Sequence, residues 1–192
     1  KPKKIYVVVS YSESWLVRAA KDLGVEVIEF QHGAFSKYHL GYSYKSSTKL
    51  HYFPDVFLVW NQYWKDMIPF PKDLVDIQTH PFYFQNSEVK KYKYVKKVEN
   101  QVVVLSQGTI SNKMAKIILD NFDFFKDKVI KYKLHPGEYN RYAGYNYLTA
   151  LLEKGNVEIV LETDLYHLLA SSEYQVGVYS TAIYEGLEFG LT

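Results

Sequence analysis

The sequence predicts an α/β protein in which two doubly wound parallel-sheet units face a cleft. Three observations predict this fold class. Short apolar runs rich in β-branched residues alternate with helical segments along the chain. Two of these runs, at 5–10 and 101–106, are continuously apolar in their middle, as strands buried on both faces are. A lysine-rich segment at 87–99 interrupts the alternation once, after which the pattern starts again.

The first half of the chain is expected to supply part of one unit. Its first helix follows the first strand directly, with Ser12 as a cap and Gly24 as the end. The last expected strand, 76–81, has a weaker strand pattern than the others. The expected strands are 5–10, 25–31, 55–60 and 76–81, and the expected helices are 13–24 and 62–68.

The second half repeats this architecture without an internal sequence repeat. Its expected strands are 101–106, 129–134, 157–161 and 174–179, and its expected helices are 111–125, 145–155, 164–172 and 181–190. With right-handed crossovers, each half forms a parallel sheet covered by helices, which is a Rossmann-like unit. We therefore expect a partial unit at 1–86, a solvated linker helix at 87–99 and an incomplete second unit at 100–192.

Composition narrows the classes of function. A chain of 192 residues with 47% hydrophobic and 23% charged residues is typical of a folded protein. A net charge of +2 gives no argument for a nucleic-acid partner. Cysteine is absent, and the six histidines show no metal-ligand spacing, so no metal site is expected. Without a long apolar run or a signal peptide, a cytoplasmic location is the default.

Two oddities stand out. The chain does not begin with methionine, and it stops just past a helix with no closing strand, so we expect a piece of a longer protein, truncated at both ends. The 19 tyrosines exceed what packing needs. They suit stacking on sugars or bases, while a compositional bias of the genome is the simpler explanation.

Chemistry is expected where the strands end, because open parallel sheets bind ligands outside the carboxyl ends of their strands. The motif KLHPGE places His135 directly after a strand, in a turn that Pro136 stiffens. A histidine in this position can donate a hydrogen bond to a phosphate oxygen. The alternative is a turn histidine that is bonded to the backbone.

The motif LSQGTISN follows another strand. Its Gly108 allows the backbone to pass close to a ligand, and the next helix presents free N–H groups to an anion. Thr109 or Ser111 capping that helix is a sufficient alternative explanation.

The stretch GVYSTAIYEGLEFG begins a helix with two hydroxyl groups. Ser180 and Thr181 at a helix N-terminus form a good phosphate cradle. Glu185 lies one turn further on, on the face of Thr181, where it can accept hydrogen bonds from ribose hydroxyls. An ordinary N-cap followed by an acidic residue is the alternative.

The stretch QHGAFSKYHLGY follows a strand of the first half. His32 and Gly33 would face the same cleft from the opposite unit. Histidine suits a general base, since its ordinary pKa lies near neutral pH. Phosphate-binding features in one unit and a candidate base in the other suit transfer from a nucleotide-linked donor to an acceptor. A loop histidine without a role is the alternative.

At this point the motifs resemble those of bacterial glycosyltransferases with the GT-B fold. They are most similar to the group of CDP-glycerol glycerophosphotransferases, polysialyltransferases and capsule-polysaccharide transferases. The donor domains of this group carry a Lys-x-His-Pro loop, an Asp-x-x-x-Leu-Leu helix and paired Ser/Thr before a Glu-bearing helix. The matching residues are Lys133, His135 and Pro136; Asp164, Leu168 and Leu169; and Ser180, Thr181 and Glu185. QHG is similar to the Trp-His-Gly loop of the glycerophosphotransferases, with Gln31 in place of tryptophan.

The resemblance, carried by short motifs within residues 25–190, implies a metal-independent glycosyltransferase of surface polysaccharide assembly. His32 would remove the proton of the acceptor hydroxyl, and Glu185 would hold the ribose. Donor phosphate would be held by Thr109, His135, Ser180 and Thr181. The donor is a nucleotide-activated sugar or glycerol, with CMP- and CDP-linked compounds as candidates, and no separate cofactor is implied. The acceptor would be a glycan or a lipid-linked molecule. This acceptor class implies that the protein associates peripherally with the inner face of the membrane.

Two other functions stay open. A non-hydrolysing sugar-nucleotide epimerase on the same fold would need further acid/base carboxylates in the cleft, and the sequence assigns none. A non-catalytic module would bind a nucleotide sugar without turnover.

Overall fold

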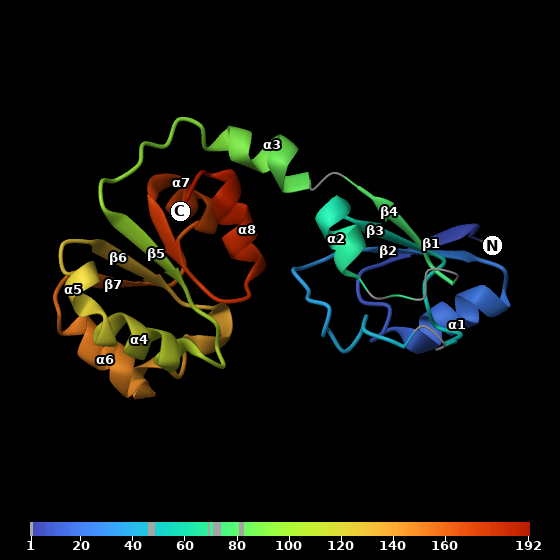
Figure 1. Ribbon diagram of the computed structural model, residues 1–192, viewed down its shortest axis with the longest axis horizontal. Coiled ribbons are helices and arrows are strands. Elements are labelled where there is room, and N and C mark those ends of the chain that lie inside the picture. The colour runs from blue at the N-terminus through green and yellow to red at the C-terminus, as the bar shows by residue number, and fades with distance from the viewer. Residues whose placement is uncertain (1, 46–48, 69, 71–73, 81–82) are drawn as a thin grey trace. The chain divides into compact units, whose positions relative to one another are not determined.

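The computed structural model describes residues 2–45, 49–68, 70, 74–80 and 83–192. The chain divides into two compact units, Lys1–Phe82 and Tyr83–Thr192, called unit 1 and unit 2 below. Each unit contains a four-stranded sheet whose strands all run parallel (Figure 1). The α/β fold class with two parallel sheets is therefore confirmed.

Unit 1 has the strand order β1-β2-β3-β4. Its elements are β1 (Lys4–Val7), α1 (Ser14–Asp22), β2 (Glu26–Phe30), β3 (Val56–Val59), α2 (Gln62–Met67) and β4 (Asp76–Thr79). Gly24 ends α1 as expected, with a φ of 64° that glycine adopts without strain. Ser12 is not the cap, because Glu13 occupies that position and makes no side-chain cap bond. The last strand stops at Thr79, and Pro81 lies outside the described residues.

Aromatic side chains from the connection between β2 and β3 pack against the sheet of unit 1. Phe35 and Tyr42 lie with ring centroids 6.2 and 5.1 Å from Phe57 of β3. Trp64 of α2 joins them, 4.9 Å from Phe35. Tyr42 is 1% exposed, so this tyrosine serves packing rather than ligand stacking.

Unit 2 has the strand order β7-β6-β5-β8. Its strands are β5 (Gln101–Leu105), β6 (Val129–Lys133), β7 (Val157–Val160) and β8 (Tyr174–Val176). Its α-helices are α3 (Tyr83–Lys91), α4 (Ser111–Asp120), α5 (Phe122–Phe125), α6 (Asn146–Leu152), α7 (Leu165–Ser171) and α8 (Thr181–Glu188). The helix expected at 111–125 is thus broken at Asn121, whose side chain donates to the carbonyl of Ile117. Nowhere in the described ranges is a helix long and apolar enough to cross a membrane.

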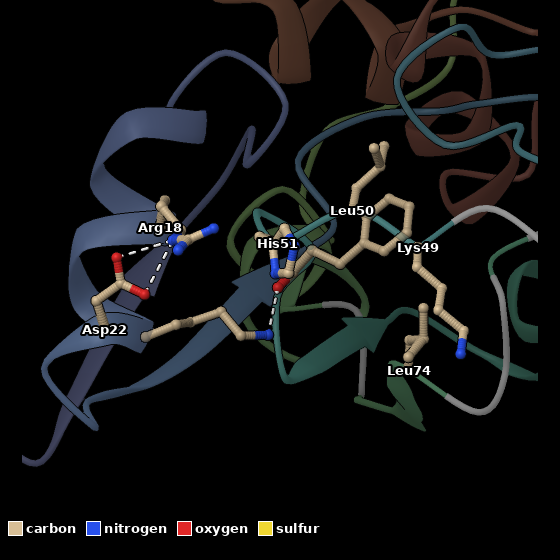
Figure 2. Close-up of a pocket in the computed structure, with 8 residues that line it drawn as sticks. Arg18, Asp22, Lys49, Leu50, His51 and Leu74 are labelled. Atoms are coloured by element: carbon tan, nitrogen blue, oxygen red, sulfur yellow. Dashed lines mark hydrogen bonds and ion pairs between the residues drawn. The ribbon is translucent and has the colours of Figure 1, made fainter.

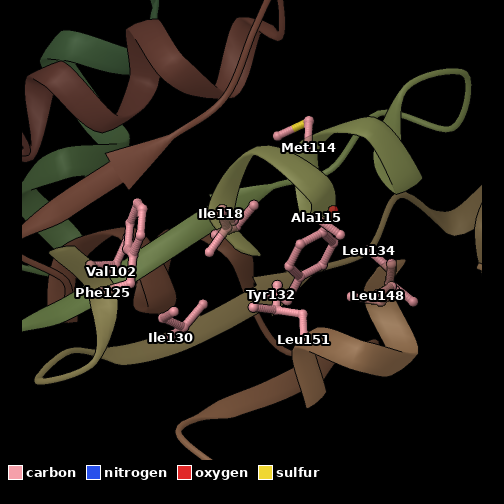
Figure 3. Close-up of a cluster of buried hydrophobic side chains, with 11 residues drawn as sticks. Val102, Met114, Ala115, Ile118, Phe125, Ile130, Tyr132, Leu134, Leu148 and Leu151 are labelled. Atoms are coloured by element: carbon pink, nitrogen blue, oxygen red, sulfur yellow. The ribbon is translucent and has the colours of Figure 1, made fainter. Parts of the chain in front are cut away.

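Strand β5 is the centre of unit 2, and all five of its residues are buried. Val102 and Val104 belong to a cluster with residues of α4 and α6, which Figure 3 shows. Val103 and Leu105 belong to a second cluster with residues of α7 and α8. Alternate side chains of one strand therefore enter two cores, which explains why this run is apolar without alternation.

The linker helix expected at 87–99 is wrong in its extent. Helix α3 ends at Lys91, and the following segment packs against unit 2 instead of continuing as a solvated helix. The N–H of Val98 donates to the carbonyl of Ser171, and the Lys97 ammonium donates to the carbonyl of Ser172. The backbone groups of Val98, Ser171 and Ser172 thus find hydrogen-bond partners outside a helix. Burial lowers the pKa of the Lys97 ammonium.

Helix α8 lies close to its preceding strand. A Cβ atom at Gly186 would come within 2.1 Å of the Gln175 side-chain oxygen of β8. The Gln175 amide also donates to the carbonyl of Ile183 in α8, at 3.1 Å. The missing side chain at Gly186 and this hydrogen bond together fix the helix against β8.

Candidate functional site

The strand order of unit 2 reverses between β5 and β8, because β6 and β7 lie on one side of β5 and β8 lies on the other. Ligands of open parallel sheets bind beyond the carboxyl ends of the strands at such a switch point. The loops after the two strands meet here: the hydroxyl of Thr109 lies 3.2 Å from that of Tyr179. Helix α4 has no side-chain cap bond, so the capping explanation for Thr109 and Ser111 is wrong.

A hollow of about 370 Å³ lies at this end of unit 2. Its wall includes residues that follow all four strands: Ser106, His135, Thr163 and Ser180. Small-molecule pockets have volumes of about 300–1,000 Å³. The hollow can therefore hold part of a nucleotide-sized ligand.

His135 presents a hydrogen-bond donor at this hollow. Its Nδ1 accepts a hydrogen bond from the backbone N–H of Gly137 at 3.1 Å. In the neutral ring the proton is then on Nε2, which can donate. The ring is exposed, so this N–H is accessible to a ligand. The hydrogen bond to the turn backbone thus occupies Nδ1 and leaves Nε2 for a ligand.

Lys133 brings a positive charge to the same wall. Its ammonium donates to the hydroxyl of Tyr139 at 3.2 Å and to the carbonyl oxygens of Leu134 and Leu161. The hydroxyl of Tyr139 donates in turn to the carbonyl of Leu161, at 2.5 Å. The charge is half-buried and surrounded by neutral oxygen atoms, which favours an anionic ligand nearby.

Glu138 lies behind the His135 turn and was not singled out from the sequence. Its side chain is 0% exposed. Its Oε2 accepts hydrogen bonds from the N–H of His135 at 2.9 Å and from the hydroxyl of Ser106 at 2.7 Å. The spacing of a capping box, three residues after the cap, is the sequence signal that was missed.

Arg141 is a second residue that the sequence analysis missed. Its guanidinium donates to the carbonyl of Gly108 at 3.1 Å, in the loop after β5. A Cβ atom at Gly108 would lie 2.6 Å from this guanidinium, so glycine permits the approach. An exposed cation therefore lies beside the loop that carries Thr109. No local pattern in the sequence indicates a contact between residues 33 positions apart.

The start of α8 brings a hydroxyl and a helix N-terminus to the hollow. The Oγ of Ser180 accepts a hydrogen bond from the N–H of Ala182 at 3.3 Å, which makes Ser180 the N-cap. Ser180 and Ala182 both line the hollow. Thr181 is half-buried next to them. The cap explanation is thus confirmed for Ser180, and the helix N-terminus still lies where an anion would be stabilised.

Glu185 lies against α7 rather than among the residues that line the hollow. Burial raises the pKa of this carboxyl, and a hydrogen bond from Tyr166 acts in the opposite direction. Tyr166 in turn belongs to an aromatic group with Tyr92 and Phe189. The structure therefore brings His135 and Ser180 together and places Glu185 beside Tyr166.

His32 in unit 1 is presented by a well-tied loop. The buried side chain of Gln31 donates to the carbonyl of Gly33 at 3.0 Å and accepts from the N–H of Trp60 at 3.0 Å. The indole of Trp60 donates back to the Gln31 carbonyl at 3.2 Å. Next to this anchor the side chain of His32 is exposed. Its role as a base stays a prediction.

A buried carboxylate lies under this loop. The Oε1 of Glu29 accepts hydrogen bonds from the hydroxyl of Tyr42 at 2.7 Å and from the N–H of Ser10 at 3.3 Å. His39 stacks on Tyr42 with ring centroids 4.7 Å apart. Burial lowers the pKa of His39, and the charge of His32 lowers it further.

Glu29 is expected to make the stability of unit 1 fall as pH rises. Burial raises the pKa of this carboxyl, so the fold favours its protonated form. That contribution is complete below the unfolded pKa of about 4.3 and is lost as pH rises through the folded pKa. The difference in free energy of unfolding between wild type and Glu29→Gln should therefore move against the wild type from about pH 4 to about pH 8.

Tryptophan fluorescence during urea unfolding measures this difference in unit 1 alone, because Trp15, Trp60 and Trp64 all lie there. A difference that is constant across these pH values would contradict the expected burial effect.

Unit 1 also has a hollow of about 300 Å³, near the last turns of α1 (Figure 2). Two of its cations are already paired: Arg18 binds Asp22 at 2.8 Å, and Lys21 binds Asp55 at 2.9 Å. It lies beside the residues that precede β3 and β4, away from the carboxyl ends of the strands. The hollow of unit 2 is therefore the stronger candidate. Over the ranges that the structure describes, no three His, Asp or Glu residues could hold a metal ion together.

Comparisons with known proteins agree with this architecture. No protein-family model and no curated protein matches the sequence. The pneumococcal O-GlcNAc transferase GtfA, solved with UDP and GlcNAc, is similar in structure with a TM-score of 0.56 and 11% identity, over 92% of this chain and 38% of that one. The UDP-GlcNAc 2-epimerase of Methanocaldococcus jannaschii, solved with UDP-GlcNAc and UDP, has a TM-score of 0.58 and 11% identity, over 99% of this chain and 59% of that one.

The chain has a GT-B-like α/β fold. At 11% identity the similarity shows the fold alone, which a transferase and an epimerase share. The chain also spans less than two thirds of the length of either protein.

Proposed function

We propose that this GT-B-like chain belongs to a glycosyltransferase of surface polysaccharide assembly that uses a nucleotide-activated donor. The observation that carries the proposal is the hollow at the switch point of unit 2, where a histidine donor, a lysine and a helix N-terminus converge. Donor groups of this kind suit the phosphates of a nucleotide, and the transferred group is a sugar or a glycerophosphate.

Each group has a distinct task toward the donor phosphates. The Nε2–H of His135 and the hydroxyl of Ser180 donate hydrogen bonds, while the ammonium of Lys133 supplies charge. Thr109 and Thr181 would extend these contacts along the phosphates. Because these groups are held by the fold before the ligand arrives, they can stabilise the charge that develops on the leaving phosphate.

Ribose binding by Glu185 stays part of the proposal, with a condition that the structure adds. The carboxyl shares a hydrogen bond with Tyr166. A ribose hydroxyl would therefore have to compete with this tyrosine or bind the remaining oxygen. The donor class also widens, because both similar proteins were solved with UDP. UDP joins CMP and CDP as a candidate nucleotide.

An epimerase is the second candidate function, because the epimerase structure is as similar to the chain as the transferase structure. The two activities differ in their need for an acceptor. An epimerase changes a nucleotide sugar incubated alone, whereas a transferase releases nucleotide when an acceptor hydroxyl is present. A binding module without catalysis would bind the nucleotide and do neither.

Replacing His135 with alanine is expected to weaken nucleotide binding about 10- to 100-fold, or about 1.5–3 kcal/mol, the scale of a hydrogen bond to a charged group. Isothermal titration calorimetry with CMP, CDP, UDP and GDP measures this effect and identifies the preferred nucleotide. His51→Ala serves as a matched control, since it removes an exposed histidine of unit 1. Equal affinities for wild type and His135→Ala would place the phosphate elsewhere, and binding of none of the four nucleotides would contradict the proposed donor class.

A further inference from the structure

Glu138 is more deeply buried than a turn carboxylate needs to be. In a capping box on the surface, the cap side chain accepts one N–H group and an exposed glutamate accepts the other. Here the side chain is 0% exposed, and its Oε1 has no hydrogen-bond partner. Burying a carboxylate with one oxygen unsatisfied costs stability. Such a cost calls for an explanation beyond the capping of a three-residue turn.

The contacts of Glu138 connect two strand ends. Its Oε2 accepts from the N–H of His135, after β6, and from the hydroxyl of Ser106, after β5. Ser106 also lies 2.8 Å from the hydroxyl of Ser111, at the first turn of α4. Glu138 thus lies at the point where the ends of β5 and β6 meet the first turn of α4.

The orientation of the His135 ring depends on the same turn. The ring accepts the N–H of Gly137 at Nδ1, and that N–H points correctly while the turn Pro136–Glu138 is closed. Glu138 closes the turn by binding the N–H of His135. It therefore helps to hold the ring in the form with its proton on Nε2, without lying at the surface of the hollow itself.

We propose that Glu138 is the positioning residue for His135, and that it acts on the bound phosphate through that ring. The inference rests on the proposed function of the hollow. A donor that is held in place before binding loses less conformational entropy when the ligand arrives. The positioning role depends on the length of the Glu138 side chain, because one carboxylate oxygen must accept from both the N–H of His135 and the hydroxyl of Ser106.

Two substitutions separate the effect of side-chain length from the effect of charge. Glu138→Gln keeps an acceptor oxygen at the same distance and should bind nucleotide within about 3-fold of wild type. Glu138→Asp keeps the charge but is shorter by one methylene group, and it should lose about 5- to 50-fold in affinity, as should Glu138→Ala. If the alanine protein does not fold, the pair of Gln and Asp variants carries the test. Wild-type affinity in Glu138→Asp would overturn the proposal.

A double-mutant cycle tests whether Glu138 acts through His135. The protein with both His135→Ala and Glu138→Ala should bind nucleotide about as weakly as His135→Ala alone, because the positioned ring is already gone. Losses that multiply would mean that Glu138 acts on the nucleotide by another route, and would overturn the proposal.

The third measurement needs no nucleotide. The ¹⁵N chemical shifts of the His135 ring, assigned by their absence in His135→Ala, should show the proton on Nε2 in wild type and in Glu138→Gln. In Glu138→Asp the two nitrogens should move toward an average of both tautomers. Unchanged shifts would overturn the positioning role. Changed shifts in a protein that binds no nucleotide would instead support the role of Glu138 and contradict the proposed function of the hollow.

Discussion

Replacing His32 with alanine is expected to lower the rate of transfer about 10²–10⁴-fold, the range for the loss of a general base. Nucleotide affinity should stay nearly unchanged, because the proposed phosphate contacts all belong to unit 2. The exposed ring of His32 stands beside Gln31, which is tied to the end of β3. A side chain on a fixed loop can be positioned for proton transfer without a separate support. A transfer assay beside isothermal titration calorimetry measures both quantities.

The pattern of the two measurements identifies the role of His32. Removing a general base lowers the transfer rate alone, whereas removing a phosphate-binding residue lowers nucleotide affinity and transfer rate together. His51→Ala removes another exposed histidine of unit 1, at a different end of the sheet, and should change neither. Parallel losses of rate and affinity would contradict the base assignment, and wild-type behaviour would return His32 to an ordinary loop residue.

Ile118→Ala is expected to lower the free energy of unfolding of unit 2 by about 2–5 kcal/mol, the usual result of removing a large aliphatic side chain from a core. Ile118 is 0% exposed and packs in the cluster between α4 and α6 (Figure 3). The same helix offers a matched control, since the neighbouring Ile117 is 60% exposed. Ile117→Ala should change stability by less than about 0.5 kcal/mol.

Far-UV circular dichroism during denaturant unfolding follows both variants. Tryptophan fluorescence provides an internal reference, because all three tryptophans lie in unit 1 and their transition should stay at the wild-type midpoint. Similar losses in the two variants would show that α4 does not bury the face that the sequence pattern selects.

The order of the elements and the central strand of unit 2 could be read from the sequence, because burial on both faces leaves a continuous apolar run such as that of β5. The expectation that 5–10 is a strand buried on both faces is wrong, because β1 lies at the edge of its sheet and Tyr6 is 62% exposed. The packing of 92–100 could not be read in this way. Its lysines are typical of a solvated segment, yet Lys97 and Val98 find hydrogen-bond partners in residues more than seventy positions away. Contacts at such a separation leave no periodic signal in the local sequence.

Some residues of the candidate site could be predicted from the sequence by a single rule. The carboxyl-end rule selects His135 and Ser180, and the structure brings both to one hollow. Glu185 was chosen by its helical spacing from Thr181, and spacing cannot foresee that Tyr166 of another helix competes for the carboxyl. Arg141 could not be found in this way, because its partner Gly108 lies in a different loop. Glu138 had a local signal in its capping-box spacing from His135, but its contact with Ser106 in a different loop left none.

Because α8 approaches β8 so closely, we expect residues 175 and 186 to covary among homologues. The amide of Gln175 occupies the space that a side chain at Gly186 would need, and it holds α8 through the carbonyl of Ile183. A homologue with alanine at 186 would need a smaller or differently turned residue at 175, and it would lose that hydrogen bond. The start of α8 forms part of the wall of the hollow, so we expect substitutions at 175 and 186 to change the hollow although neither residue lines it.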